Sequence, residues 1–327
     1  MMDKKIASKI LSEIKAANSV LLAVHVSPDF DSLASVLAMK KVLEEMGKKT
    51  KIISFSQIPA KVLFLPGSEK IEVKDFSQIN FGDFDLFIAL DSAQERMITR
   101  SPFPKKFPKN FKIINMDHHV TNTKFGQINL VAPISSTAEI LYELFQTWGI
   151  KIDKILANIL FFGIFSDTGC FQYPLTSPQT LRTAADLMEK GALPQEAVLY
   201  LFRSYNFKTL KYWGKVLENM QVDKSGKFVW AKITKRECEQ LGVAATDIEG
   251  TSDLFAPVVS GTEFGIILNE ESKNLIRGSV RARGNFDVSR LAVELGGGGH
   301  KQAAGFSLNM GIDEAEKKVL EVAKKYI

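Results

Sequence analysis

Cysteine is scarce in this chain, with two residues, Cys170 and Cys238, among 327. They lie far apart in the sequence and lack the close spacing of metal-binding cysteines. We therefore expect neither a disulfide framework nor a thiolate metal site. Both residues are predicted to be buried, reduced thiols of a cytoplasmic protein.

Long apolar runs are also missing. The longest apolar stretch, 155–165, is interrupted by Asn158 and Gly163, and it is too short to span a bilayer. Residues 1–18 place apolar side chains at helical spacing among lysines, which indicates an amphipathic helix and not a signal peptide. The sequence predicts no membrane segment.

A strong excess of one charge is absent as well, since the formal net charge is +5. A protein that binds nucleic-acid duplexes is expected to have a higher isoelectric point and longer basic stripes. A short or small phosphorylated ligand fits this composition better. The carboxylates gather in N-terminal motifs, whereas the C-terminal part has a cluster of basic residues that could hold an anion or form a solvated face: Lys273, Arg277, Arg281, Arg283, Arg290 and Lys301.

Histidine is the most informative scarce residue. Only four occur, and each lies in a short cluster rich in aspartate or glycine: His25, His118, His119 and His300. Residues so few and so confined rarely serve as packing filler. They indicate a site for metal and phosphate.

Three short apolar runs lead into these clusters, as expected of strands buried on both faces of a parallel sheet. Open α/β sheets build their sites at the carboxyl ends of such strands. Residues 20–24 lead into His25, residues 84–90 into Asp91, and residues 111–115 into Asp117.

A fourth apolar segment, 155–165, leads to Asp167. We expect this aspartate, like the others, to lie at the carboxyl end of a strand. Each cluster alone has an ordinary explanation, because single aspartates often cap helices and single histidines are often structural. Aspartates gathered at one edge, however, would repel one another unless they were protonated or bound cations. Together the clusters therefore predict a centre for divalent metal ions.

The chain resembles a known family in two sets of motifs. The pattern His25-x-x-x-Asp29-x-Asp31, with Asp91, Asp117-His118-His119 and Asp167, resembles the motifs of the DHH phosphoesterase superfamily. The run Gly296-Gly-Gly-Gly-His300-Lys-Gln-Ala-Ala-Gly305 resembles the glycine-rich signature of its DHHA1 domain. Length and domain order are similar to the nanoRNase-like branch, compact bacterial oligoribonucleases that also act as phosphatases on 3'-phosphoadenosine 5'-phosphate.

The resemblance implies a role for each motif residue. Two divalent ions, expected to be Mn²⁺ with Mg²⁺ or Co²⁺ as alternatives, would lower the pKa of a water molecule and polarise the phosphoryl oxygens. His25, Asp29 and Asp91 would bind one ion. Asp31, Asp91, His118 and Asp167 would bind the other, so that Asp91 bridges the two. Asp117 would orient a histidine, and His119 would face the phosphoryl group. The phosphate of the substrate would be held by five residues of the C-terminal part: Arg281, Gly297, Gly298, Gly299 and His300.

The chain is predicted to be an α/β protein with two domains, because 327 residues exceed the usual size of one hydrophobic core. We expect a doubly wound DHH domain with a parallel sheet over 1–195, in which Asp31 and Ser32 cap a helix. A helical connector over 196–220 would follow. The third part, 221–327, is predicted to be a smaller α/β DHHA1 domain whose last strand follows the glycine run.

The leading functional hypothesis is a phosphoesterase for short single-stranded RNA and 3'-phosphoadenosine 5'-phosphate. A phosphodiesterase for cyclic or linear dinucleotides is the alternative enzyme, and a nucleotide sensor without turnover is the alternative of another class. An inorganic pyrophosphatase fits less well, because that relative lacks the glycine-histidine signature. Phe30 and Gln172 depart from the family pattern beside the site, so substrate preference is left open, as is homodimerisation.

Overall fold

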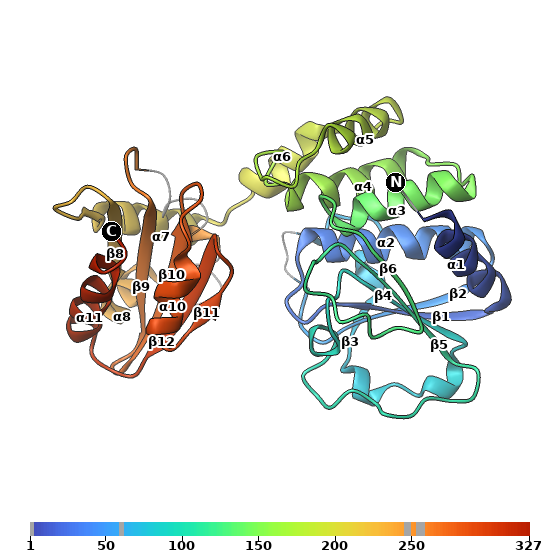
Figure 1. Cartoon of the computed structure of the whole chain (residues 1–327), viewed down its shortest axis with the longest axis horizontal. Helices are drawn as coiled ribbons and strands as arrows, with labels where there is room; N and C mark the ends of the chain where they lie inside the picture. Colours follow the sequence, from blue (N-terminus) through green and yellow to red (C-terminus); the bar gives the residue numbers. More distant parts are fainter. Residues whose placement is uncertain (1–2, 59–61, 245–249, 253–258) are drawn as a thin grey trace. The chain divides into compact units, whose positions relative to one another are not determined.

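The computed structural model describes residues 3–58, 62–244, 250–252 and 259–327. The chain forms two compact units, Met1–Ser204 and Tyr205–Ile327 (Figure 1). Each unit contains a six-stranded sheet with helices packed on it, so the predicted α/β fold is confirmed. Within the described residues, no helix is both long and apolar enough to cross a membrane.

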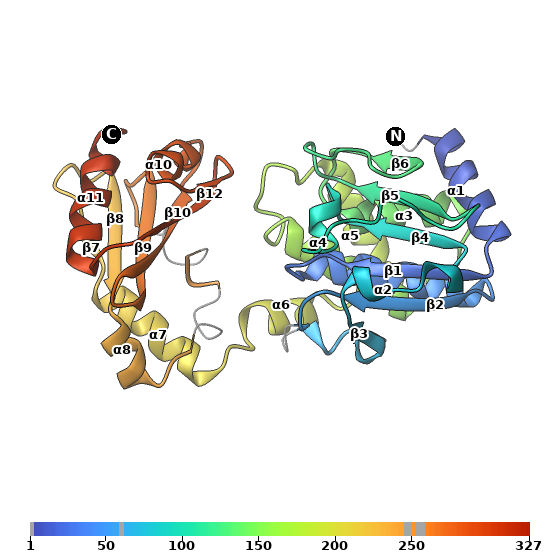
Figure 2. The same ribbon diagram turned by 90° about the horizontal axis from the view of Figure 1, so that it is seen from below.

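The sheet of the first unit is parallel throughout (Figure 2). Its strand order is β3-β2-β1-β4-β5-β6, so the direction of chain progression reverses between β1 and β4. Ligand sites of open α/β sheets lie at such switch points, beyond the carboxyl ends of the strands. The strands are β1 (Ser19–Val24), β2 (Lys49–Ser54), β3 (Ile71–Val73), β4 (Leu86–Leu90), β5 (Lys112–Asp117) and β6 (Ile128–Val131).

The two faces of this sheet are covered differently. In β1, Val20 and Leu22 belong to a core shared with helices, whereas Leu21 and Ala23 point into a second core rich in phenylalanine. Short 3₁₀ turns and the segment 100–110 cover this second face. Figure 1 shows α2, α3 and α4 together on the first face. The helices of this unit are α1 (Lys4–Ala16), α2 (Phe30–Glu45), α3 (Thr137–Trp148), α4 (Lys154–Asp167), α5 (Pro178–Glu189) and α6 (Pro194–Phe202).

Two local expectations were wrong. Residues 155–165 belong to helix α4 and do not form a strand, so Asp167 is the last residue of a helix. This helix is buried nearly all round and therefore shows no polar stripe by which its periodicity could be recognised. In α2, Asp29 and not Asp31 is the N-cap: its side chain accepts a hydrogen bond from the Ser32 amide, and Asp31 lies in the first turn.

The second unit is also built around a sheet, of order β11-β12-β10-β9-β8-β7, in which only β8 and β9 pair in parallel. Its last strand follows the glycine run, as predicted. The strands are β7 (Gln221–Val222), β8 (Phe228–Ile233), β9 (Phe264–Ser272), β10 (Leu275–Ala282), β11 (Gly298–Gly299) and β12 (Ala303–Leu308).

Helices lie on both faces of the second sheet. One core joins the sheet to α10 (Val288–Glu294) and α11 (Ile312–Lys324). The other joins it to α7 (Phe207–Glu218), which buries Tyr212 completely, with α8 (Lys235–Leu241) beside it. The predicted connector 196–220 therefore covers α6 of the first unit and α7 of the second.

Close packing of α2, α3 and α4 depends on Gly163. A Cβ at this position would lie 2.5 Å from the Cβ of Ala138, 2.7 Å from Oδ1 of Asp31 and 3.2 Å from the Cβ of Ala34. The first two distances are shorter than real Cβ contacts and the third is tighter than most, so a side chain would force the helices apart. Because Asp31 is one of the predicted metal ligands, this glycine also determines how closely α4 approaches the site.

We expect Gly163→Ala to destabilise the protein by about 1–3 kcal/mol through overpacking, as measured by urea unfolding. Gly214→Ala is the matched control. Gly214 also lies inside a helix, but a Cβ there would meet nothing within 4 Å, so the better helix former should stabilise α7 by about 0.5–1 kcal/mol. Stabilisation by Gly163→Ala would contradict this account of the helix packing.

Candidate metal centre

The predicted histidines and aspartates of the first unit meet at one edge of its sheet. His25 directly follows β1, Asp91 directly follows β4, and Asp117 is the last residue of β5. These three strands are neighbours and run parallel, so their carboxyl ends lie side by side. The N-terminus of α2 and the C-terminus of α4 supply Asp31 and Asp167 to the same place.

Asp91 is the centre of the cluster. Its Oδ2 lies 3.7 Å from Nε2 of His25, and its Oδ1 lies 3.5 Å from Nε2 of His118. The residue is 2% exposed, and the hydroxyl of Thr137 donates a hydrogen bond of 3.0 Å to Oδ1. Its φ of 52° lies in the left-handed region, which aspartate and asparagine tolerate better than most residues. The two carboxylate oxygens thus face two different histidines.

His25 and Asp29 form one side of the cluster. Nε2 of His25 is 3.1 Å from Oδ2 of Asp29, and one ligand atom each of His25, Asp29 and Asp91 lies within 4.8 Å of the others. His25 is buried, whereas more than half of the Asp29 side chain is exposed. This side of the cluster therefore reaches the protein surface.

His118, Asp31 and Asp167 form the other side, again with ligand atoms within 4.8 Å of one another. Nε2 of His118 is 3.4 Å from Oδ2 of Asp167. The other ring nitrogen, Nδ1, lies 3.2 Å from the carbonyl oxygen of Ile134. A carbonyl can only accept, so Nδ1 must be the donor, which leaves the lone pair of Nε2 directed at the carboxylates.

The first turn of α3 stabilises Asp31 in its ionised form. Oδ2 of Asp31 accepts a 2.8 Å hydrogen bond from the amide of Thr137, and Oδ1 accepts one of 3.0 Å from the amide of Ala138. Free amides and the dipole at a helix N-terminus favour a negative charge. Neither Thr137 nor Ala138 was predicted to belong to the site. The sequence marks Ser136-Thr137 only as a helix start, and nothing in it indicates which carboxylate that start faces.

The cluster carries more negative charge than the protein alone neutralises. Burial, reinforced by neighbouring carboxylates, raises the pKa values of Asp31 and Asp91 well above their ordinary range, and the pKa of Asp167 to about 7. Among the residues that the structure describes, the ion pairs of these aspartates involve histidine alone, with no lysine or arginine. Such a set of oxygen and imidazole donors fits divalent cations.

His119 differs from its neighbour His118. Its Nδ1 lies 3.8 Å from Oδ1 of Asp91 and could join a metal group by distance. That nitrogen, however, already forms a 2.7 Å hydrogen bond with Oδ1 of Asp117, which raises the pKa of His119, whereas burial lowers the pKa of His118. Geometry and charge therefore favour His118 as the ligand and leave Nε2 of His119 for another partner.

Asp117 is fully buried and is held by a second residue. Its Oδ2 accepts a 2.6 Å hydrogen bond from the side-chain amide of Asn122. Although burial acts to raise the pKa of Asp117, the hydrogen bonds from His119 and Asn122 keep it below its usual value. Asn122 was not predicted. It lies three residues beyond His119, in a turn whose geometry no sequence motif reveals.

The predicted substrate residues all lie in the second unit. Arg281 is half-buried on β10 opposite Ala303 of β12, and the His300 amide donates to the carbonyl of Ala303, so Arg281 and His300 lie near each other at the end of the β11-β12 hairpin. Packing explains two of the glycines: a Cβ at Gly297 would lie 2.1 Å from the Gly305 carbonyl, and one at Gly299 would lie 2.5 Å from Cα of Ala304. At Gly298 a Cβ would meet nothing within 4 Å.

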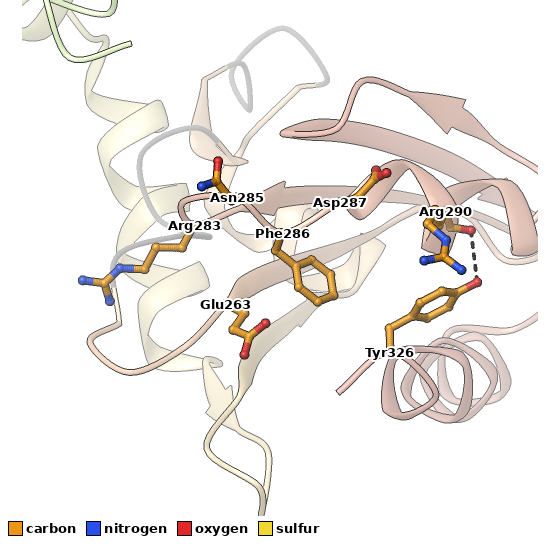
Figure 3. A pocket seen from close by; sticks show the side chains of 7 residues that line it. All are labelled: Glu263, Arg283, Asn285, Phe286, Asp287, Arg290 and Tyr326. Atoms are coloured by element: carbon orange, nitrogen blue, oxygen red, sulfur yellow. Dashed lines mark hydrogen bonds between the residues drawn. The ribbon is translucent and has the colours of Figure 1, made fainter. Parts of the chain in front are cut away.

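A separate pocket of about 540 Å³ lies in the second unit (Figure 3). Arg290 lies over the Tyr326 ring, with its guanidinium carbon 5.6 Å from the ring centre. Glu263, at the pocket wall, pairs with Lys227 at 2.9 Å. Two of the basic residues noted in the sequence thus belong to this pocket and not to the Arg281-His300 corner. The lining residues are Glu263, Arg283, Asn285, Phe286, Asp287, Arg290 and Tyr326.

Comparison with known proteins identifies relatives of the whole chain. Residues 19–164 match the DHH family N-terminal domain, and residues 240–327 match the DHHA1 domain. The bifunctional oligoribonuclease and PAP phosphatase NrnA of Thermus thermophilus is 29% identical, over 98% of this chain and 93% of that protein. MG371 of Mycoplasma genitalium is 30% identical, over 94% and 92%. The crystal structure of an exopolyphosphatase-related protein from Bacteroides fragilis covers 100% of this chain and 97% of that chain, with a TM-score of 0.90 and 26% identity.

Cation binding at this centre should depend on pH. A cation must displace the protons of carboxyls with raised pKa values, including that of Asp167 at about 7. We expect the affinity for Mn²⁺ to fall as the pH is lowered from 8 to 6, by about tenfold per pH unit for each proton displaced. Isothermal titration calorimetry in buffers of different ionisation enthalpy measures affinity and proton release together. A constant affinity without proton release would show that these carboxyls are not the ligands.

Proposed function

The chain belongs to the DHH family, and on that premise we propose that it is a phosphoesterase of short single-stranded oligoribonucleotides and 3'-phosphoadenosine 5'-phosphate. The observation that carries the proposal is the cluster around Asp91, where buried carboxylates meet imidazoles at the switch point of the sheet and, within the described part of the chain, pair with no lysine or arginine. The substrate class rests on the name of the Thermus relative. A cytoplasmic location and Mn²⁺ as the native ion, with Mg²⁺ or Co²⁺ as alternatives, are part of the proposal.

Each side of the cluster is assigned to one divalent ion. Ligand atoms lie within 4.8 Å of one another in the set His25, Asp29 and Asp91, and again in the set Asp31, His118 and Asp167, which supports this division. The two Asp91 oxygens lie near different histidines, which supports a bridging role for that residue. One ion is assigned to His25, Asp29 and Asp91, and the other to Asp31, Asp91, His118 and Asp167.

Two bound cations would supply the acidity that turns a water molecule into a nucleophile at neutral pH and would neutralise charge on the phosphoryl oxygens. The protein adds an oriented imidazole. With Nδ1 fixed by buried Asp117, His119 has Nε2 left to bond a phosphoryl or leaving-group oxygen. In its protonated form Nε2 donates, and the Asp117 carboxylate stabilises that form. His119 and Asp117 are therefore assigned to catalysis and not to metal binding.

The second unit is assigned to substrate binding. Arg281 and His300 lie near each other at the end of the β11-β12 hairpin and offer charged and polar donors suited to a phosphate group. Of the three glycines predicted to hold phosphate, Gly298 is the one with open space beside its backbone, whereas packing accounts for Gly297 and Gly299. With these phosphate-binding groups, the second unit would select substrates that carry a further phosphate besides the one that reacts.

An activity panel with the purified protein in Mn²⁺ tests the proposal. We expect 3'-phosphoadenosine 5'-phosphate and short oligoribonucleotides to be hydrolysed well and long structured RNA poorly. Preference for a cyclic dinucleotide or its linear product would replace the proposed substrate by that alternative. Tight binding of all these compounds without turnover would point to a nucleotide sensor.

We expect Asp91→Asn to abolish turnover because it removes a carboxylate shared by both ion positions. Asparagine is the suitable replacement because it tolerates the left-handed backbone at this position, so the fold should survive. Asp85→Asn is the matched control: Asp85 lies at the opposite end of the same strand, where it accepts hydrogen bonds from the amides of Asn18 and Ser19. Steady-state assays and circular dichroism check both variants. Near-normal turnover by Asp91→Asn would disprove the shared-ligand assignment.

We expect Arg281→Ala to lower kcat/KM on 3'-phosphoadenosine 5'-phosphate by roughly tenfold to a hundredfold, equivalent to the ~1.5–3 kcal/mol of a charge-assisted hydrogen bond. A simple phosphodiester that carries no second phosphate should be affected much less. Arg283→Ala, which removes a more exposed arginine from the pocket of Figure 3, is the control. An equal loss on both substrates would mean that Arg281 serves the chemistry or the fold.

A further inference from the structure

The backbone directly after Asp167 has an unusual conformation. Gly169, Cys170 and Phe171 have φ values of 55°, 61° and 64°, three consecutive residues in the left-handed region. For the two residues with a Cβ this conformation is unfavourable and persists only where the surroundings enforce it. Strained backbone of this kind is concentrated at functional sites. The side chains of this turn are therefore candidates for a functional role.

Packing and hydrogen bonds hold this turn in place. The Phe171 ring packs against Phe161 and Phe165 of α4, with ring centres 6.4 and 5.5 Å away. The Phe171 amide donates to the hydroxyl of Thr168, the residue next to Asp167. The turn is thus fastened to the end of the helix that supplies a metal ligand.

The turn brings Tyr173 back over its own backbone. The amides of Gln172 and Tyr173 both donate to the carbonyl of Thr168, at 2.9 and 3.0 Å. A Cβ at Gly169 would lie 2.5 Å from Cζ of Tyr173 and 2.6 and 2.7 Å from its two Cε atoms. Because both Cε atoms are almost as close as Cζ, the ring covers Gly169 with its face and not with an edge. Only a residue without a side chain allows this contact.

Tyr173 is nevertheless 53% exposed. A planar aromatic group that is both exposed and held against the backbone loses little conformational entropy when it binds another planar group. Nucleobases stack on such rings whatever their identity, since every base has a flat face. The Tyr173 amide donates to the carbonyl of Thr168, the residue beside Asp167, so the stacking surface belongs to the chain segment that supplies the proposed metal ligand.

We propose that Tyr173 is a stacking platform for a nucleobase of the substrate. The inference rests on the proposed function, because it requires a nucleotide substrate. It deepens that function by giving the enzyme a contact to the base in addition to its contacts with phosphate. Gln172, which departs from the family pattern, is exposed in the same turn.

The test compares a short oligoribonucleotide with the same molecule carrying abasic residues. The measured quantity is kcat/KM for the intact oligoribonucleotide divided by kcat/KM for the abasic one. Tyr173→Ala should lower this ratio by about tenfold to a hundredfold, the effect of losing one stacked base. Tyr173→Leu, which keeps an apolar side chain without a flat face, should lower it similarly, and Tyr173→Phe should restore it.

Leu175→Ala is the matched control, because Leu175 is 50% exposed in the same segment and has no flat face. It should leave the ratio unchanged. An unchanged ratio in Tyr173→Ala and Tyr173→Leu, with an active wild type, would overturn the stacking role alone. A wild type that hydrolyses neither substrate would instead overturn the proposed function, and with it this inference.

Discussion

Repulsion among buried carboxylates is the constraint that the groups around the cluster of the first unit must satisfy. Asp31 and Asp91 are 1% and 2% exposed, and Asp117 is fully buried beside them. Removing an ionised carboxylate from water costs several kcal/mol unless opposite charges or hydrogen bonds compensate it. Hydrogen bonds supply part of that compensation: the α3 amides bond Asp31, the hydroxyl of Thr137 bonds Asp91, and His119 and Asn122 bond Asp117. The remaining donors could hold divalent cations, which would supply the rest.

The fold brings these devices together over long sequence distances. The reversal of strand order between β1 and β4 opens the sheet edge at which His25 and Asp91 lie. Helix α3 directs its first amides at Asp31, more than a hundred residues earlier in the chain. Gly163 lets α4 approach closely enough to add Asp167. The geometry of the cluster is thus a consequence of how tightly three helices pack on one sheet face.

The sequence predicted which residues gather at this sheet edge better than it predicted the groups that hold them there. The candidate ligands could be found because they follow strands whose carboxyl ends must meet, and the predicted family is confirmed by the matches to both domains. The helical state of 155–165 was missed because a helix buried all round has no polar stripe. Thr137 and Asn122 were missed because their partners are determined by tertiary packing. The glycine run was predicted to approach phosphate, yet strand packing accounts for Gly297 and Gly299.

We propose that Asp91 joins two cation positions while His119 remains outside both. Anomalous diffraction from crystals grown with Mn²⁺ tests this most directly. The account predicts two peaks, each within coordination distance of one Asp91 oxygen, with the hydrogen bond between His119 and Asp117 intact. A single peak, or a peak coordinated by Nδ1 of His119 with that hydrogen bond broken, would contradict it.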